Sequence, residues 1–144
     1  MEKFPSVVGD AMSSPVINVD GEINVRDSAL LMTEKGIGSI VVIERGIAVG
    51  IVTKRDMMQK VVSLCLDPCE TKIKDIMSSP LITANKEMGI LAAMRKMREN
   101  KITQLVVMDG DRLEGVISER DVMKAVSYAS LASFKPLMRE EQQR

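Results

Sequence analysis

The feature that most constrains this 144-residue chain is an internal duplication. Residues 8–61 align without a gap on residues 73–126, at a constant offset of 65. Met12-Ser13-Ser14-Pro15 recurs as Met77-Ser78-Ser79-Pro80, and the stretch from Gly50 to Asp56 recurs from Gly115 to Asp121. A duplication of this length indicates two similar supersecondary units packed with pseudo-two-fold symmetry, so any site is expected as a related pair.

Charge and composition exclude several classes of protein. Twenty basic and twenty acidic residues cancel, which argues against nucleic acid as the main partner. No apolar run reaches the ~20 residues that a membrane helix needs, and the chain opens without an apolar leader. We therefore expect no membrane association and a cytoplasmic location.

The residue types that are missing bear on chemistry. The chain has no histidine, and aromatic residues make up 2% of it, so it lacks the usual proton shuttle and any aromatic platform for bases. It also lacks a phosphate-binding G-x-x-x-x-G-K-[ST] loop and a nucleophile beside a base. We therefore expect a protein that is not an enzyme and has no catalytic cofactor.

Two cysteines, Cys65 and Cys69, lie between the repeats. Without histidine, two thiols cannot complete a four-ligand zinc site within one chain. Reduced structural thiols and a disulfide both remain open at this stage.

Each repeat has the pattern of a β-α-β-β-α unit, which makes the fold class α+β with small mixed sheets. Proline-bounded strands, helical periodicity and glycine-containing turns predict the elements. The predicted ranges are strand 16–19, helix 25–34, strands 39–43 and 48–52 and helix 54–64, and then strand 81–84, helix 87–99, strands 104–108 and 113–117 and helix 119–129. The predicted organisation is repeat 1 over 8–64, a linker over 65–72, repeat 2 over 73–128 and a C-terminal tail over 129–144, of which residues 139–144 are expected to be a frayed polar end.

Thr53-x-x-Asp56 and Ser118-x-x-Asp121 stand where a strand ends and a helix begins. One interpretation is a capping box, with the hydroxyl at the N-cap and the acid three residues later. The other is a binding rim: the motif occurs twice, and it follows a glycine that lets a ligand approach the backbone. A carboxylate there can accept hydrogen bonds from a ribose diol, and helix N–H groups can hold a phosphate. The two roles are compatible, because both side chains have spare lone pairs.

These motifs together resemble the cystathionine-β-synthase (CBS) domain. The resemblance rests on Met-Ser-x-Pro, then an apolar-Val-Val strand, then Gly-Ile-Val-Thr-x-x-Asp, and it covers about residues 8–128. Two such domains in tandem form a CBS pair, or Bateman module. The chain thus resembles a stand-alone CBS pair.

The resemblance implies two adenosine-binding clefts between the repeats, which take AMP, ADP, ATP or S-adenosylmethionine-like molecules. The motif acid would hold the ribose, and the hydroxyl before it would approach the phosphate. The residues implied for one cleft are Asp121, Ser118, Val116, Arg120, Ser14, Ile17, Val19, Ile37, Gly38 and Ser39, and those for the other are Asp56, Thr53, Lys54, Ile51, Ser79, Ile82, Ala84, Ile102, Thr103 and Gln104. Ile17, Ile37, Ile82, Ile102, Ile51 and Val116 would sandwich the adenine or serve as core.

The two clefts are expected to differ, because Lys54 of the first motif is Glu119 in the second. A lysine attracts phosphate and a glutamate repels it, by about 1 kcal/mol each at surface dielectric. The Asp56 cleft is therefore expected to prefer ligands with more phosphates.

The resemblance also implies a homodimer, a disc of four CBS units, and a regulated partner that the sequence does not identify. Apolar residues of the final helices are candidate dimer contacts, although core packing explains them equally: Val61, Val62, Val122, Met123 and Val126. The alternative function is a scaffold without a ligand, in which the motifs are only helix caps.

Overall fold

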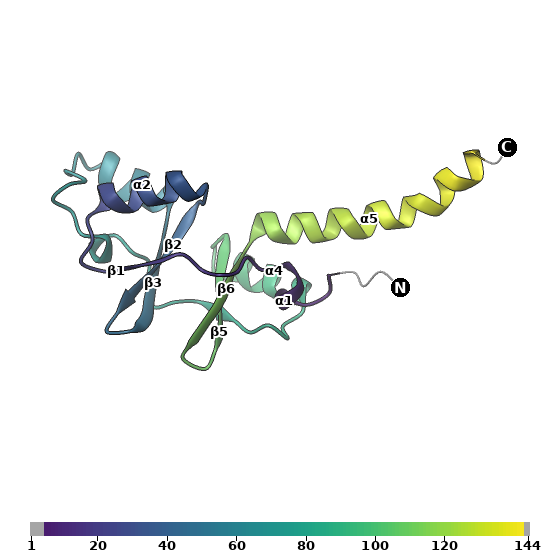
Figure 1. Ribbon diagram of the computed structural model, residues 1–144, viewed down its shortest axis with the longest axis horizontal. Helices are drawn as coiled ribbons and strands as arrows, with labels where there is room; N and C mark the ends of the chain where they lie inside the picture. Colours follow the sequence, from purple (N-terminus) through teal and green to yellow (C-terminus); the bar gives the residue numbers. More distant parts are fainter. Residues whose placement is uncertain (1–4, 143–144) are drawn as a thin grey trace. The chain divides into compact units, whose positions relative to one another are not determined.

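The computed structural model describes residues 5–142, with side chains up to residue 130, and divides into two compact units (Figure 1). Unit 2 is Pro15–Ile82, and unit 1 combines the described residues up to Ser14 with those from Thr83 onward. The unit boundaries are thus shifted from the repeat boundaries. The short segment that opens each repeat packs with the sheet of the other repeat.

Unit 2 contains one sheet and the helices of the first repeat. Its elements are β1 (Asn18–Asp20), α2 (Val25–Lys35), β2 (Ser39–Glu44), β3 (Ile47–Thr53), α3 (Lys54–Met57), a π-helical turn (Met58–Val62) and a 3-10 turn (Ile73–Asp75). The predicted single helix over 54–64 is therefore a short α-helix followed by a wider turn.

Unit 1 contains the corresponding elements of the second repeat. They are α1 (Val8–Ala11), β4 (Thr83–Ala84), α4 (Ile90–Glu99), β5 (Gln104–Asp109), β6 (Arg112–Ser118) and α5 (Glu119–Gln142). The prediction that the last helix ends near Ala129 was wrong, because α5 continues to Gln142. The following residues include many good helix formers, which lets the helix propagate. Of the predicted frayed end, residues 143–144 lie outside the described part.

The two sheets have the same topology, which confirms the expected small mixed sheets. In each, the first strand runs parallel to the second, and the second pairs antiparallel with the third through a hairpin. Each antiparallel pair has a register shift at an equivalent place, between Val42 and Ile43 and between Val107 and Met108. Positive φ angles at Arg45 and Gly46 fit the tight turn that the sequence predicts there.

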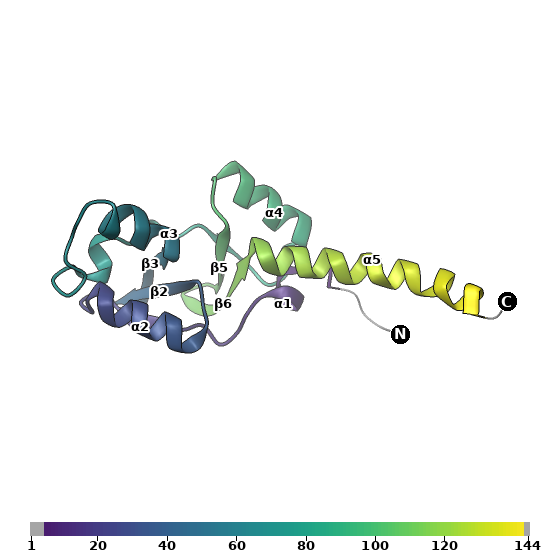
Figure 2. The same cartoon turned by 90° about the horizontal axis from the view of Figure 1, so that it is seen from above.

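The core of unit 2 lies between one face of its sheet and its helices. Figures 1 and 2 show α2 and α3 beside each other on this sheet. The face is formed by alternate strand residues such as Ile40, Val42 and Val52, and the helical side contributes Met32 and Val61. This packing fixes the junction of β3 and α3, where the first motif lies.

Candidate functional site

Both motifs are complete capping boxes. Asp56 Oδ2 accepts hydrogen bonds from Thr53 N at 2.8 Å and Thr53 Oγ1 at 3.1 Å, and Asp56 N donates to Thr53 Oγ1 at 3.2 Å. In the second repeat, Asp121 Oδ2 accepts from Ser118 N at 2.9 Å and Ser118 Oγ at 3.0 Å, and Asp121 N donates to Ser118 Oγ at 3.1 Å. The predicted caps are therefore confirmed, and each uses only one oxygen of its carboxylate.

The other oxygen distinguishes the two motifs. Asp56 Oδ1 accepts a hydrogen bond from Ser78 Oγ at 3.3 Å and lies 3.3 Å from Lys60 Nζ. Among the described residues, nothing bonds to Asp121 Oδ1, and this side chain belongs to a half-buried residue. Asp121 thus presents an uncommitted carboxylate oxygen at the junction of β6 and α5.

The sequence reasoning did not identify Lys60 or Ser78 as parts of this site. Lys60 follows Asp56 by four residues, the spacing of neighbours on one helix face, and Ser78 belongs to a repeated segment. Ser78 reaches the motif through a two-way backbone bridge with Ile51, and Ser13 makes the same bridge with Val116. The repeated Met-Ser-Ser-Pro segment is therefore part of each motif's surroundings.

The repeated glycine has a packing role in both units. A Cβ at Gly50 would lie 2.5 Å from Met77 Sδ, and one at Gly115 would lie 2.7 Å from Met12 Sδ. The space beside each glycine is filled by a methionine of the chain, and the approach of a ligand to the backbone at this strand end stays a prediction.

The segments before β2 and β5 lie beside the motif of their own unit. Lys54 N donates to Gly38 O at 3.1 Å, and Glu119 N donates to Thr103 O at 2.8 Å. Ser39 is in register with Thr53, as Gln104 is with Ser118. Their assignment to the cleft of the opposite motif stays a prediction.

The predicted site residues are divided between the units. Unit 2 holds Ile17, Val19, Ile37, Gly38, Ser39, Ile51, Thr53, Lys54, Asp56, Ser79 and Ile82, and unit 1 holds Ser14, Ala84, Ile102, Thr103, Gln104, Val116, Ser118, Arg120 and Asp121. Val19 is buried in the core of unit 2, and Ala84 is buried as well. The predicted adenine-sandwiching residues are half-buried and keep some accessible surface.

Gln104 carries the one buried side-chain oxygen or nitrogen that has no hydrogen-bond partner within the described residues. This atom is Oε1, and the residue opens β5 opposite Ser118. A buried acceptor without a partner costs about 1–3 kcal/mol. A donor from a ligand would remove that cost.

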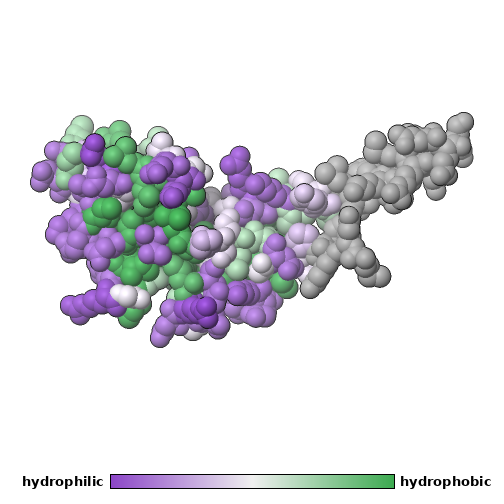
Figure 3. All heavy atoms as spheres, in the orientation of Figure 1, coloured by the Kyte–Doolittle hydropathy of each residue, from purple (hydrophilic) through white to green (hydrophobic). Residues whose placement is uncertain are grey.

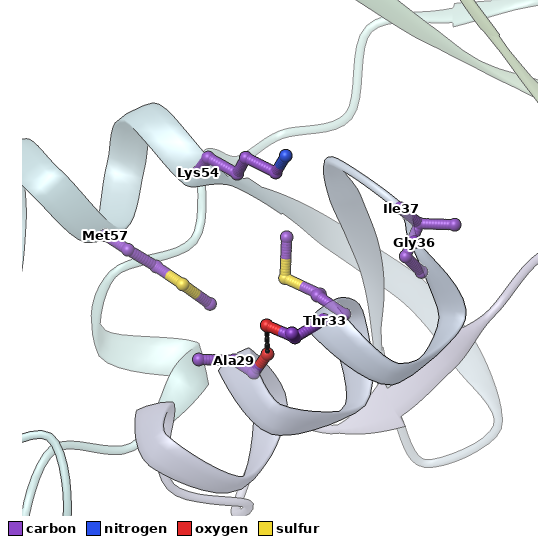
Figure 4. A pocket seen from close by; sticks show the side chains of 7 residues that line it. Ala29, Thr33, Gly36, Ile37, Lys54 and Met57 are labelled. Atoms are coloured by element: carbon purple, nitrogen blue, oxygen red, sulfur yellow. Dashed lines mark hydrogen bonds between the residues drawn. The ribbon is translucent and has the colours of Figure 1, made fainter.

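Unit 2 has a pocket of about 370 Å³ between α2 and α3 (Figure 4). Its lining is mostly apolar, from Ala29, Met32, Thr33, Gly36, Ile37, Lys54 and Met57. Figure 4 shows Lys54 extending from the start of α3 toward α2, and Thr33 Oγ1 donating to Ala29 O at 2.8 Å. The pocket brings together Ile37 and Lys54 of the predicted residues, without Thr53 or Asp56.

Other kinds of site are not found in the part of the chain that the structure describes. No group of three or more histidine, cysteine, aspartate or glutamate side chains there could hold a metal ion. None of its helices is long and apolar enough to cross a bilayer. Cys65 and Cys69 are exposed free thiols.

Two repeats of one topology, each with a hydroxyl–carboxylate motif at a strand–helix junction, define a tandem module of a regulatory class. The chain belongs to the CBS domain family, whose model matches it twice, over residues 8–63 and 73–128.

Comparison with known proteins supports the same assignment. An uncharacterised protein of Methanopyrus kandleri is 34% identical over 123 residues, which cover 84% of this chain and 63% of that relative. The chain thus spans less than two thirds of that relative's length. A putative signal-transduction protein with CBS domains from Burkholderia ambifaria is 31% identical, with a TM-score of 0.78 over 83% of this chain and 93% of that structure.

A further solved structure shows a similar fold. The CBS domain pair of protein MJ0100, in complex with 5′-methylthioadenosine and S-adenosyl-L-methionine, also has a TM-score of 0.78. It is 23% identical, and the match covers 85% of this chain and 97% of that structure. At this identity the likeness supports the fold alone.

Proposed function

We propose that this chain is a regulatory module that binds adenosine compounds at its two Thr/Ser-x-x-Asp motifs and signals to a partner protein by a change of conformation. It is a sensor in the cytoplasm and catalyses no reaction. The observation that carries this proposal is the uncommitted Oδ1 of Asp121, at a helix start where Ser118 is the cap and Oδ2 already accepts from Ser118.

The chemistry of Asp121 suits a ribose. A carboxylate oxygen with free lone pairs accepts hydrogen bonds from hydroxyl groups, and each bond to a charged group contributes about 1.5–3 kcal/mol. Ser118 holds the other oxygen, so the carboxylate is oriented before the ligand arrives. The buried Gln104 Oε1 in the same unit offers a second acceptor that a ligand donor would satisfy.

The ligand class is also supported by a protein of the same fold. The CBS pair of MJ0100 was solved with 5′-methylthioadenosine and S-adenosyl-L-methionine, both adenosine compounds. We extend that ligand class to this chain as AMP, ADP, ATP or an S-adenosylmethionine-like molecule. The downstream effect requires that the ligand favour one conformation over another.

The charges beside the motifs bear on which ligand each site prefers. Lys54 is exposed and, within the described residues, forms no ion pair, whereas Glu119 stands at the equivalent place in the second motif. The Asp56 site therefore favours ligands with more phosphates than the Asp121 site does. Lys54→Glu reverses the charge, so it should lower the affinity for ATP by about 2 kcal/mol, which is roughly 30-fold, and leave that for adenosine unchanged.

The alternative is a scaffold that binds no ligand. The complete capping boxes favour it, since they give both motifs a structural role without a ligand. Large apolar side chains exposed on the final helices, such as Val62 and Met123, also suit an interaction surface.

Thermal unfolding separates these functions. The purified chain is heated alone and with AMP, ADP, ATP, S-adenosylmethionine and GTP as a control. A ligand at 100 times its dissociation constant adds about 2.7 kcal/mol, which is roughly 5–10 °C in Tm for a domain of this size.

If the chain is a sensor, at least one adenosine compound should raise its Tm, and Asp121→Asn should reduce that rise. Asp111→Asn, a control in the exposed β5–β6 turn, should leave the rise unchanged. Ser118 still caps the helix in the Asp121→Asn variant, and the asparagine oxygen can still accept the bond from Ser118 N, so the ligand-free Tm should change little. If none of the compounds changes the Tm, the motifs act only as helix caps, and the scaffold is favoured.

A further inference from the structure

The clearest difference between the two motifs is a lysine that only the first repeat has. Lys60 aligns with Ala125 at the offset of 65 residues. Its ammonium lies 3.3 Å from Asp56 Oδ1 and donates to Ile76 O at 2.9 Å. Asp56 is buried, with 13% of its side chain exposed, so this cation covers an oxygen that has little access to water.

The backbone around Lys60 differs as well. Lys60 lies in the π-helical turn Met58–Val62, where Ser63 N donates to Met58 O at 2.9 Å, whereas α5 has no such turn at the equivalent place. A π turn inserted in a helix is often found at functional sites. Here it places Lys60 within reach of both Asp56 and the carbonyl of Ile76.

We propose that Lys60 is an internal counterion that occupies the Asp56 carboxylate and makes the two motif sites unequal. The Asp121 site binds an adenosine ligand first, and the Asp56 site binds only when the ligand displaces the Lys60 ammonium. This inference rests on the proposed function and concerns the order and affinity of binding at the same motifs.

The physical reason is competition for one oxygen. Both sites present a carboxylate whose Oδ2 is bound by its own cap, but Oδ1 of Asp56 already accepts from Ser78 and faces Lys60. A neutral ribose hydroxyl must replace a charge-assisted contact there, whereas at Asp121 it replaces only water. Since an interaction with a charged group contributes about 1.5–3 kcal/mol, the Asp56 site should bind on the order of tenfold more weakly.

Displacement of Lys60 also has a structural consequence. Ile76 stands directly before Met77 and Ser78, the segment that bridges β3 through Ile51. When the ammonium leaves Asp56, its bond to Ile76 O is strained or lost. Occupancy of the Asp56 site thereby loosens the segment that joins the second repeat to the sheet of the first.

The competing explanation is an ordinary helix pair. Ion pairs at i and i+4 on an exposed helix contribute about 0.3–0.5 kcal/mol and have no effect on ligands. A second competing role is direct attraction of the ligand's phosphate by Lys60. The three roles predict different changes in ligand affinity at the Asp56 site when Lys60 loses its charge. A counterion predicts a gain, a helix ion pair predicts no change, and attraction of the phosphate predicts a loss.

The test measures AMP and adenosine binding by isothermal titration calorimetry on the full chain. Asp121→Asn leaves only the Asp56 site, and Asp56→Asn leaves only the Asp121 site. We expect the chain with Asp56→Asn to bind adenosine, which has no phosphate for Lys54 or Glu119 to act on, about tenfold more tightly than the chain with Asp121→Asn. Adding Lys60→Met to Asp121→Asn should restore about tenfold in affinity, for adenosine as well as AMP.

Three controls sharpen this result. Lys60→Gln keeps a donor for Ile76 O but removes the charge, and should give the same gain as Lys60→Met. Lys124→Met removes an equal charge from the exposed face of α5 and should change nothing. Lys60→Met added to Asp56→Asn should also change nothing, because the Asp121 site has no such cation.

Equal affinity for adenosine at the two sites, or an unchanged affinity after Lys60→Met in the chain with Asp121→Asn, would overturn the counterion role. A loss of AMP affinity after Lys60→Met would assign Lys60 to the phosphate and overturn it too. Failure of the proposed function looks different, since the unsubstituted chain and every variant would bind no adenosine compound, and the inference would fall with it.

Discussion

At the scale of single residues, the repeated glycines Gly50 and Gly115 allow close packing of a neighbouring segment. Each leaves room for the methionine of a Met-Ser-Ser-Pro segment, but the two environments are not equal. A Cβ at Gly50 would meet mainly the side chain of Met77, whereas one at Gly115 would also lie 2.8 Å from the backbone oxygen of Ser13. A methionine side chain can rotate away, and a carbonyl held in a backbone bridge cannot.

Gly115→Ala should therefore destabilise the fold more than Gly50→Ala. We expect losses in the free energy of unfolding of about 2–3 kcal/mol for Gly115→Ala and about 1–2 kcal/mol for Gly50→Ala, as overpacked sites usually show. Urea unfolding measures both. Gly38→Ala is the matched control, because the nearest atom to its Cβ lies at 3.8 Å, and it should cost little. Equal losses at Gly115 and Gly38 would contradict this packing argument.

The sequence predicted the motif part of the candidate site but not its surroundings. Thr53-x-x-Asp56 could be read as a cap because its partners are three residues apart and local. The contact of Lys60 with Asp56 depends on a π turn, and that of Ser78 depends on a segment 22 residues further along the chain that packs against the motif. No local sequence pattern encodes either feature. The uncommitted oxygen of Asp121 is likewise found only by comparing the two motifs in the structure. Lys60 lies beside Asp56, whereas the equivalent position in the second repeat is Ala125.

At the scale of elements, the two long helices of the repeats differ in their caps. Asn24 Oδ1 accepts from Asp27 N at 2.8 Å at the start of α2, while Gly89, the equivalent residue before α4, gives no side-chain cap. Asn24→Ala should lower the free energy of unfolding by about 1 kcal/mol, and Gly89→Asn should raise it by a few tenths. The added side chain has space, since no atom lies within 4 Å of a Cβ at Gly89. Chemical unfolding of Asn24→Ala and Gly89→Asn measures both changes in the free energy of unfolding. A stabilising Asn24→Ala would contradict the role of Asn24 as a cap.

An ion triad links the turn after β1 with the segment that opens the second repeat. Hydrogen bonds from Lys72 and Lys74 lower the pKa of Glu22 to about 2, and the same carboxylate raises the pKa of Lys74. A carboxyl whose pKa is lower in the folded state stabilises the fold above its unfolded pKa of about 4.3, and the gain is lost as the pH falls toward 2. Glu22→Gln should thus be less stable than the unsubstituted chain at pH 6.

This difference should shrink between about pH 4.3 and 2, and it should also shrink in 1 M salt, because the triad is exposed. Urea unfolding at pH 6, 4 and 2.5 measures it, with Glu34→Gln on the exposed face of α2 as control. A difference that stays constant across this range would show that the triad does not form in solution.

Strands and hairpins were the elements that the sequence predicted best. Their apolar runs are short and bounded by glycine-containing turns, and the observed strands differ from the predicted ones by one or two residues at most ends. The first helix, α1, was not predicted, since four residues are too few to show a period. The extent of α5 was missed because helix ends depend on propensity and context more than on any single residue.

At the scale of the whole molecule, the two repeats of the sequence and the two compact units of the structure have different boundaries. The segment opening the first repeat lies with β4, β5 and β6, and the segment opening the second lies with β1, β2 and β3. Ile73 and Ile76 are buried in the core of the first repeat's sheet. A chain cut between the repeats would therefore leave each sheet without part of its core, which explains why the duplication is retained within one chain.

The candidate dimer contacts separate into two groups in the structure. Val61 and Val122 are 3% and 1% exposed and belong to the core, which decides in favour of core packing for these two. Val62, Met123 and Val126 are 71%, 61% and 46% exposed. Figure 3 shows further apolar side chains gathered on one face of unit 2. The three exposed residues remain the candidates for contact between two copies of the chain.

If they form a two-fold interface, each side chain is buried twice per dimer. Burial of one such side chain contributes about 1.5–3 kcal/mol, so Val62→Glu or Met123→Glu should raise the dimer dissociation constant at least about 100-fold. Ile47→Glu is the matched control: this residue is 55% exposed but belongs to the β2–β3 hairpin and not to a final helix. Sedimentation should show a dimer for the unsubstituted chain and for Ile47→Glu, and a shift toward monomer for the other two. A monomer in every case, or a dimer weakened only by Ile47→Glu, would show that the final helices do not form the interface.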